Sequence, residues 1–290
     1  MRDVLIIDNT VLLDVINQSN MVTREFAMML DILKELSYKV LVSYELMEEI
    51  YKQMYQKARN NDDVRTISLA FEKQIFNFIS SEEQGEIIEH IVDTSKEEDE
   101  RFLCALEENN LFRRDFKMIA YKIDDIKGLR NVIDMQSFKK VLLIFCDNIT
   151  TIEEFVDAVK TILYTLCFDE GIVESIKHLG DGFDARKKEI LHHLYCIDSE
   201  IPEIMKQNLG GYREIGEKMT IRCSPEADRG IVKNQLTKTM QGIEINCELH
   251  TKMKRLTSSA PDRIYFCPKL PPEIDESNGQ PYIYKITKHV

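Results

Sequence analysis

Near its N-terminus the chain reads Val4-Leu5-Ile6-Ile7-Asp8-Asn9-Thr10, an apolar run that ends in a carboxylate. The length of the run and its closing Asp-Asn pair predict a buried β-strand over residues 3–8. Similar patterns predict strands over residues 38–43 and 87–92, and helical periodicity fills the segments 23–36, 44–57, 64–79 and 98–109. Strands that alternate with helices indicate βαβ units and a parallel sheet. The predicted fold class of this part of the chain is therefore α/β.

The sequence changes character after Asp147. Residues 140–146 form an apolar run that predicts a last strand, and residues 151–208 follow an almost continuous helical pattern that starts with a capping sequence at Thr151. After Gly210-Gly211 the residues favour strands, over 219–223, 243–247, 263–267 and 282–286. We therefore predict a parallel-sheet domain over residues 1–147. A helical segment and a small β-rich C-terminal module should follow over residues 148–290.

Composition narrows the class of protein. A hydrophobic fraction of 43% fits a folded globular chain, and no stretch approaches the ~18 apolar residues of a membrane span. The N-terminus lacks the basic and apolar regions of a secretory signal, so we expect a cytoplasmic protein with no membrane partner. The seven cysteines are scattered and none forms a Cys-x-x-Cys pair, which argues against a disulfide framework or a zinc ribbon.

Four acidic residues stand where a parallel sheet would gather them. Asp8 ends the first strand, Glu49 follows the second strand on a helix, Asp99 opens a helix, and Asp115 follows a possible short strand. Open α/β sheets bind ligands outside the carboxyl ends of their strands, and clustered carboxylates there suit a hard divalent cation such as Mg²⁺ or Mn²⁺. For the fourth acid, Asp124, Asp125 and Asp147 are open alternatives to Asp115.

These segments resemble the PIN-domain nuclease family. The opening Leu5-Ile6-Ile7-Asp8-Asn9-Thr10 is similar to the first family motif, although the family usually has Asp-Thr-Asn where this chain has Asp-Asn-Thr. The segment around Glu49 resembles the second motif, Asp99-Glu100-Arg101-Phe102-Leu103 the third, and the segment 111–116 with Asp115 the fourth. The resemblance covers residues 1–147, about half of the chain.

The resemblance implies a PIN-like fold and Mg²⁺- or Mn²⁺-dependent cleavage of RNA or DNA. A divalent ion held by carboxylates polarises a phosphoryl oxygen and lowers the pKa of a bound water. Asp8 and Asp99 would be the main metal ligands, Glu49 would bind the metal directly or through water, and Asp115 would hold a second ion or orient the attacking water. RNA is the favoured substrate, and the role could be that of a toxin or defence effector.

The C-terminal module carries basic residues among aromatic ones. Residues 229–290 hold ten Lys and Arg against six Asp and Glu, a net charge of +4, in a chain whose net charge is −12. We predict nucleic-acid contacts, or the docking of a protein partner, at four of these residues: Lys252, Lys254, Arg255 and Arg263. The module also resembles RelE-like ribonuclease toxins, which would place the chemistry there. A second alternative is a non-catalytic interaction protein on a PIN-like scaffold.

Histidines offer weaker candidates. His192 and His193 are adjacent on a predicted helix and point about 100° apart, so they cannot share a metal as residues one turn apart do. His250 and His289 could act as a general base and a phosphate contact, but ordinary surface positions are the simpler expectation. There is no Walker-type phosphate loop and no Gly-x-Gly-x-x-Gly motif, so nucleotide triphosphate and dinucleotide binding by those motifs have no support.

Overall fold

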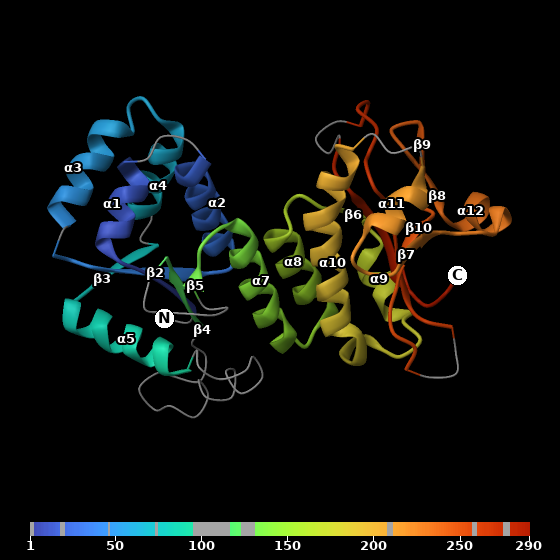
Figure 1. The fold of residues 1–290 in the computed structure, drawn as a ribbon, viewed down its shortest axis with the longest axis horizontal. Coiled ribbons are helices and arrows are strands. Elements are labelled where there is room, and N and C mark those ends of the chain that lie inside the picture. Colours follow the sequence, from blue (N-terminus) through green and yellow to red (C-terminus); the bar gives the residue numbers. More distant parts are fainter. Residues whose placement is uncertain are drawn as a thin grey trace. The chain divides into compact units, whose positions relative to one another are not determined.

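The computed structural model describes residues 3–17, 21–45, 47–72, 75–94, 117–122, 131–207, 211–256, 260–274 and 279–290. The chain divides into two compact units, Met1–Leu142 and Leu143–Val290, which Figure 1 shows. The division falls shortly before the boundary at 147/148 that the sequence suggested. Each unit has its own sheet, so the mixed α/β class is confirmed.

The first unit is built on a parallel sheet whose described strands have the order β3-β2-β1-β4-β5. They are β1 (Asp3–Ile7), β2 (Tyr38–Ser43), β3 (Phe76–Ile79), β4 (Lys117–Tyr121) and β5 (Asn131–Val132). The chain builds outward from β1 through β2 to β3, and then continues on the other side of β1 with β4. The direction of winding therefore reverses between β1 and β4, where Ile7 lies opposite Tyr121.

Helices cover both faces of this sheet (Figure 1). On one face lie α1 (Asn9–Asn17), α2 (Met21–Glu35), α3 (Met47–Lys57) and α4 (Asp62–Glu72), and on the other lies α5 (Ser81–Thr94). The apolar runs of the central strands are buried between these layers, because Leu5, Ile6, Ile7, Val40 and Val42 have no exposed surface. A strand covered on both faces reads as a continuous apolar run, as β1 does.

Three sequence predictions in this region are wrong. Residues 87–92 lie in helix α5, because Ser80 and Glu83 cap its start reciprocally. Residues 76–79 do not continue a helix but form β3, which pairs beside β2. The run 140–146 belongs mostly to helix α7 (Met135–Phe145), whose buried residues recur at helical spacing as Phe138, Val141, Leu142 and Phe145.

The second unit has a mixed sheet of order β6-β12-β11-β10-β7 and a separate β8-β9 pair. The strands are β6 (Cys167–Phe168), β7 (Cys223–Pro225), β8 (Thr237–Met240), β9 (Ile243–Asn246), β10 (Leu249–Lys252), β11 (Arg263–Cys267) and β12 (Tyr282–Thr287). The helices are α8 (Ile152–Ile162), α9 (Ile172–Lys177), α10 (Phe183–Met205), α11 (Tyr212–Lys218) and α12 (Arg229–Gln235).

The strands predicted near 243, 263 and 282 are confirmed, and strands β7 to β12 all lie in the C-terminal part of this unit, after the helical segment. Thr151 caps α8, as the sequence predicts, by accepting a hydrogen bond from the Glu154 backbone at 3.3 Å. The helical segment is not continuous, because β6 interrupts it and pairs with β12. Strand β10 was missed, since four residues with a central histidine give little sequence signal.

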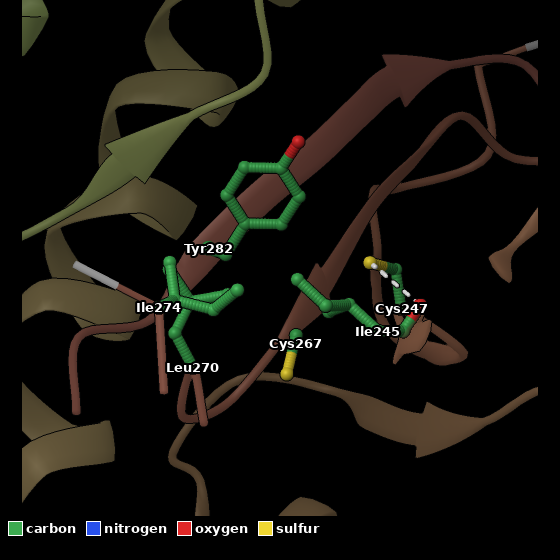
Figure 2. Packing of buried hydrophobic residues seen from close by; sticks show 6 residues of the cluster. All are labelled: Ile245, Cys247, Cys267, Leu270, Ile274 and Tyr282. Atoms are coloured by element: carbon green, nitrogen blue, oxygen red, sulfur yellow. Dashed lines mark hydrogen bonds between the residues drawn. The ribbon is translucent and has the colours of Figure 1, made fainter. Parts of the chain in front are cut away.

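A small apolar cluster closes one end of this sheet (Figure 2). It contains six buried residues: Ile245, Cys247, Cys267, Leu270, Ile274 and Tyr282. Its two cysteines are free thiols, as are Cys146, Cys167, Cys196 and Cys223, and Cys104 lies outside the described residues. Burial raises the pKa of Cys196 to about 11 and that of Cys223 to about 12, so these thiols are poor nucleophiles near neutral pH.

Candidate functional site

Asp8 occupies the switch point of the first sheet. It directly follows β1, which lies between β2 and β4. One carboxylate oxygen, Oδ1, accepts hydrogen bonds from the backbone N–H of Thr10, at 2.8 Å, and from the Thr10 hydroxyl. The carboxylate is only partly buried, which keeps it within reach of a ligand. In open α/β sheets this crevice is the usual ligand site.

Two buried side-chain amides, those of Asn9 and Gln84, bind the backbone at the end of β2 and at the end of β1, which directly precedes Asp8 in the sequence. Asn9 donates from Nδ2 to the carbonyl oxygen of Ser43, at 2.6 Å, and to its hydroxyl, at 3.2 Å. Gln84 on α5 donates to the carbonyl oxygen of Ile7 at 3.0 Å. The oxygen of the Asn9 side-chain amide, Oδ1, is buried and has no hydrogen-bond partner. An unpartnered buried oxygen on the residue that follows Asp8 in the sequence is a donor of the kind that a hard cation or its bound water uses.

The neighbouring strands β4 and β5 bring further charges to this edge. Tyr121 ends β4 and is buried, and its pKa is raised by burial and by the nearby charges of Glu25 and Asp134. The ammonium of Lys122 lies 5.2 Å from the Tyr121 ring centre. Asp134 caps α7 by accepting a hydrogen bond from the Ser137 N–H at 2.8 Å. Nothing in the sequence pattern had distinguished Asp134 from an ordinary surface acid.

Of the other predicted acids, Glu49 lies within the described residues and Asp99 and Asp115 do not. Glu49 lies in the first turn of α3, where Gln53 donates to it at 2.8 Å and Lys52 approaches within 4.0 Å. These are ordinary contacts along one helix, and the Glu49 side chain is 46% exposed. Asp99 and Asp115 lie outside the described residues, as do Asp124 and Asp125. Within the described ranges, no group of three His, Cys, Asp or Glu residues is arranged to hold a metal ion.

A second candidate site lies wholly within the second unit. A cavity of about 810 Å³ is lined by all four basic residues that the sequence singled out, Lys252, Lys254, Arg255 and Arg263. The rest of its lining comes from α10 and from segments next to β7, β10 and β11: Lys188, Glu189, His192, His193, Ile221, Arg222, Met253 and Pro261. Six of the twelve lining residues are Lys or Arg and one is acidic, so the cavity is strongly basic. We call it the basic pocket.

The strand register explains how three of these cations come together. Lys252 on β10 lies opposite Arg263 on β11, and its backbone N–H donates to the carbonyl oxygen of Arg222 at 3.0 Å. The three side chains therefore form one row across adjacent strands. A second row, two residues along each strand on the same face, consists of Ser224, His250 and Tyr265. His250 and Tyr265 confirm this geometry, since their rings lie 5.1 Å apart.

Three buried polar atoms on this sheet face have no hydrogen-bond partner: Ser224 Oγ, His250 Nε2 and Arg263 Nε. His250 Nδ1 lies 3.2 Å from the carbonyl oxygen of Glu248, which can only accept, so Nδ1 carries the proton. Burial and the charge of Arg263 lower the pKa of His250 to about 4, which makes the ring neutral at physiological pH. His250 is only 2% exposed, so the expected surface position for this histidine is wrong.

A buried ion cluster supports the pocket wall. Arg186 on α10 is fully buried and binds three carboxylates, those of Asp181, Glu189 at 2.7 Å and Asp262 at 3.0 Å. Asp262 also accepts from the Gly180 N–H at 2.8 Å, and Glu189 accepts from the Lys254 N–H at 2.5 Å. The cluster thus links α10 to the backbone of Lys254 and, through the Asp262 carboxylate, to the backbone of Gly180. His193 lies in the same wall, where burial and neighbouring positive groups lower its pKa to about 4.

Comparisons of the chain with protein-family models, with curated proteins and with solved structures found no match. In the ranges that the structure describes, no helix has the length and apolar character needed to cross a membrane.

Proposed function

We propose that the chain is a divalent-metal-dependent phosphodiester hydrolase, with RNA as the favoured substrate, and that its reaction centre is the carboxyl edge of the first sheet. The observation that carries the proposal is the position of Asp8 at the switch point between β1 and β4. A parallel sheet with helices on both faces also suits the PIN-like scaffold that the sequence resembles.

The donor set near Asp8 fits a hard cation in part. The Asp8 carboxylate and the unpartnered Asn9 Oδ1 are oxygen donors of the kind that Mg²⁺ and Mn²⁺ prefer. Glu49, Asp99 and Asp115 stay predictions as further ligands. A bound ion would stabilise charge on the phosphoryl oxygen and activate a water. The hydrogen bonds from Thr10 would hold the Asp8 carboxylate in one orientation toward such an ion.

The test compares two Asp→Asn variants of the full chain. Asp8→Asn removes a charge at the switch point, whereas Asp14→Asn removes the same charge from an exposed position on α1. We expect Asp8→Asn to abolish Mn²⁺ binding in calorimetry and to slow RNA cleavage by more than about 100-fold, the upper end of the losses seen for residues that only support metal ligands. Asp14→Asn should match the wild type. Metal binding unchanged in Asp8→Asn would contradict the proposal.

A second candidate places a RelE-like ribonuclease activity in the second unit. The observation in its favour is that Lys252, Lys254, Arg255 and Arg263 line one pocket. Cleavage that persists in chelator and in Asp8→Asn, but is lost in a Lys252→Ala and Arg255→Ala double variant, would support this candidate. Absence of cleavage under every condition would favour the non-catalytic interaction protein.

A further inference from the structure

The basic pocket holds more positive charge than its surroundings neutralise. Among the described residues, no carboxylate lies within ion-pair distance of Arg222, Lys252, Lys254 or Arg255. Arg263 has one such partner, Glu226 at 2.8 Å. The single acidic lining residue, Glu189, is already bound to Arg186. A protein that gathers like charges without counter-charges pays in repulsion, and an anionic ligand removes that cost.

Among the cations of the pocket, Arg222, Lys252 and Arg263 have the most constrained positions. Their spacing is fixed by three hydrogen-bonded strands rather than by a flexible loop. Burial and the charges of Arg263 and Arg222 lower the pKa of Lys252, which shows that the three cations oppose one another. Arg263 also keeps a buried, unpartnered Nε–H, while its Nη1 donates to Glu226. An acceptor placed over the row would satisfy a donor that the protein leaves open.

We propose that the basic pocket binds a small organic phosphate of mononucleotide size, whose phosphate group sits on Arg222, Lys252 and Arg263. Guanidinium and ammonium groups that share one row of a sheet and line one pocket suit a phosphate. The cavity of about 810 Å³ lies within the usual range for small-molecule sites, so inorganic phosphate alone would leave most of it empty. The lining also supplies Ile221, Met253, Pro261 and the ring of His192, which suit the organic part of the ligand.

The charge of the whole chain favours a compact ligand over a nucleic-acid strand in this pocket. At a net charge of −12, a long polyanion is repelled outside the pocket, whereas a single phosphate senses mainly the cations within about 10 Å. The bound phosphate group could belong to a free nucleotide or to the phosphorylated end of an RNA. This inference does not depend on the proposed hydrolase activity, because it concerns a different unit and is tested by binding alone.

The experiment is calorimetric titration of the full chain at low ionic strength. The probes are adenosine 5′-monophosphate, adenosine without phosphate, and a short single-stranded RNA with either a 5′-phosphate or a 5′-hydroxyl end. We expect a phosphate-dependent signal, so that adenosine does not bind. Binding of the mononucleotide identifies a free nucleotide as a sufficient ligand, and binding of only the 5′-phosphorylated RNA identifies the strand end. Either result supports the pocket.

The matched variants are two double substitutions in the second unit. Arg222→Gln with Lys252→Gln removes two charges from the pocket, and Lys218→Gln with Lys233→Gln removes two exposed charges outside it. We expect the pocket variant to weaken binding by at least about tenfold and the control to bind as the wild type does. Arg263 is left intact because it also pairs with Glu226 inside the fold.

Three results would overturn the proposal. The first is no binding of any phosphate-bearing probe at millimolar concentration. The second is an equal loss in both double variants, which would indicate a general charge effect. The third is equal binding of the 5′-phosphate and 5′-hydroxyl RNAs together with no binding of the mononucleotide. That result would make the basic residues a strand-binding surface. Circular dichroism of each variant establishes that it is folded before it is titrated.

Discussion

At the scale of single residues, the most unusual environment is that of Arg186. Its guanidinium has no exposed surface, although burying a charge is costly unless it is paired. Burial opposes the charge, but hydrogen bonds to Asp262 and Asp181 outweigh this and raise the pKa of Arg186. The three carboxylates around it depend on this one cation. They also tie α10 to the backbone near the basic pocket.

We predict that Arg186→Met destabilises the second unit by about 3–5 kcal/mol, because it leaves the buried carboxylates of Asp181 and Asp262 without a counter-charge. The measurement is urea unfolding followed by circular dichroism. The control is Arg213→Met, since Arg213 pairs with Glu217 at 3.0 Å but both side chains are mostly exposed. This exposed pair should contribute less than about 1 kcal/mol. Equal effects of the two substitutions would show that the cluster is not a stabilising centre.

At the scale of elements, the clearest lesson comes from α5. Residues 87–92 contain the apolar, β-branched pattern of a strand, yet they lie in the middle of a helix. The helix begins with a reciprocal cap, in which Ser80 Oγ accepts from the Glu83 N–H at 3.1 Å and Glu83 accepts from the Ser80 N–H at 3.0 Å. Gln84 in its first turn then reaches the end of β1, at the carbonyl oxygen of Ile7. The cap therefore also positions Gln84, which holds the end of β1 beside the candidate metal site.

We predict that Ser80→Ala lowers the stability of the first unit by about 1 kcal/mol, because the Glu83 N–H loses its acceptor. The next residue provides the control: Ser81→Ala changes an exposed hydroxyl in the same helix turn. Urea unfolding should therefore separate two chemically identical substitutions at neighbouring positions. A loss of stability for Ser81→Ala as large as that for Ser80→Ala would refute the assigned cap.

At the scale of the whole molecule, two buried histidines make stability depend on pH. The pKa of His193 and that of His250 each fall from 6.5 to about 4, mainly because burial disfavours the charged ring. As the pH falls below about 6.5, the unfolded chain takes up these protons while the folded chain does not. The stability that both histidines contribute to the folded state is therefore fully present above about pH 6.5 and is lost as the pH falls toward 4. Each histidine accounts for roughly 3 kcal/mol over this whole window.

We predict that the urea midpoint of the second unit falls between about pH 7 and about pH 5, before most carboxylates titrate. A double His193→Gln and His250→Gln variant should be less stable at neutral pH but should show a flatter dependence on pH. The control is His178→Gln, because the side chain of His178 is 63% exposed. If the double variant keeps the full wild-type slope, the pH dependence has another source.

The sequence by itself determined the features that depend on short-range patterns. The run Val4–Ile7 and its closing Asp8 placed a carboxylate at a strand end, because a buried strand needs an unbroken apolar stretch and Asp-Asn stops it. Periodicity likewise indicated the mixed α/β class, and the charge count pointed to the basic C-terminal residues. The roles of Asp8, Glu49, Asp99 and Asp115 stay predictions, because they depend on distances that spacing along the chain does not fix.

Only the tertiary structure decided which residues share a surface. Arg222, Lys252 and Arg263 lie far apart in the sequence and meet because strand pairing sets their register. A shift of that register by one residue would turn each of these side chains to the other face of the sheet. Tertiary packing also overrode the strand-like pattern of 140–146, because Phe138, Val141, Leu142 and Phe145 bury one face of helix α7. The basic pocket is therefore a product of long-range pairing, which no local pattern in the sequence encodes.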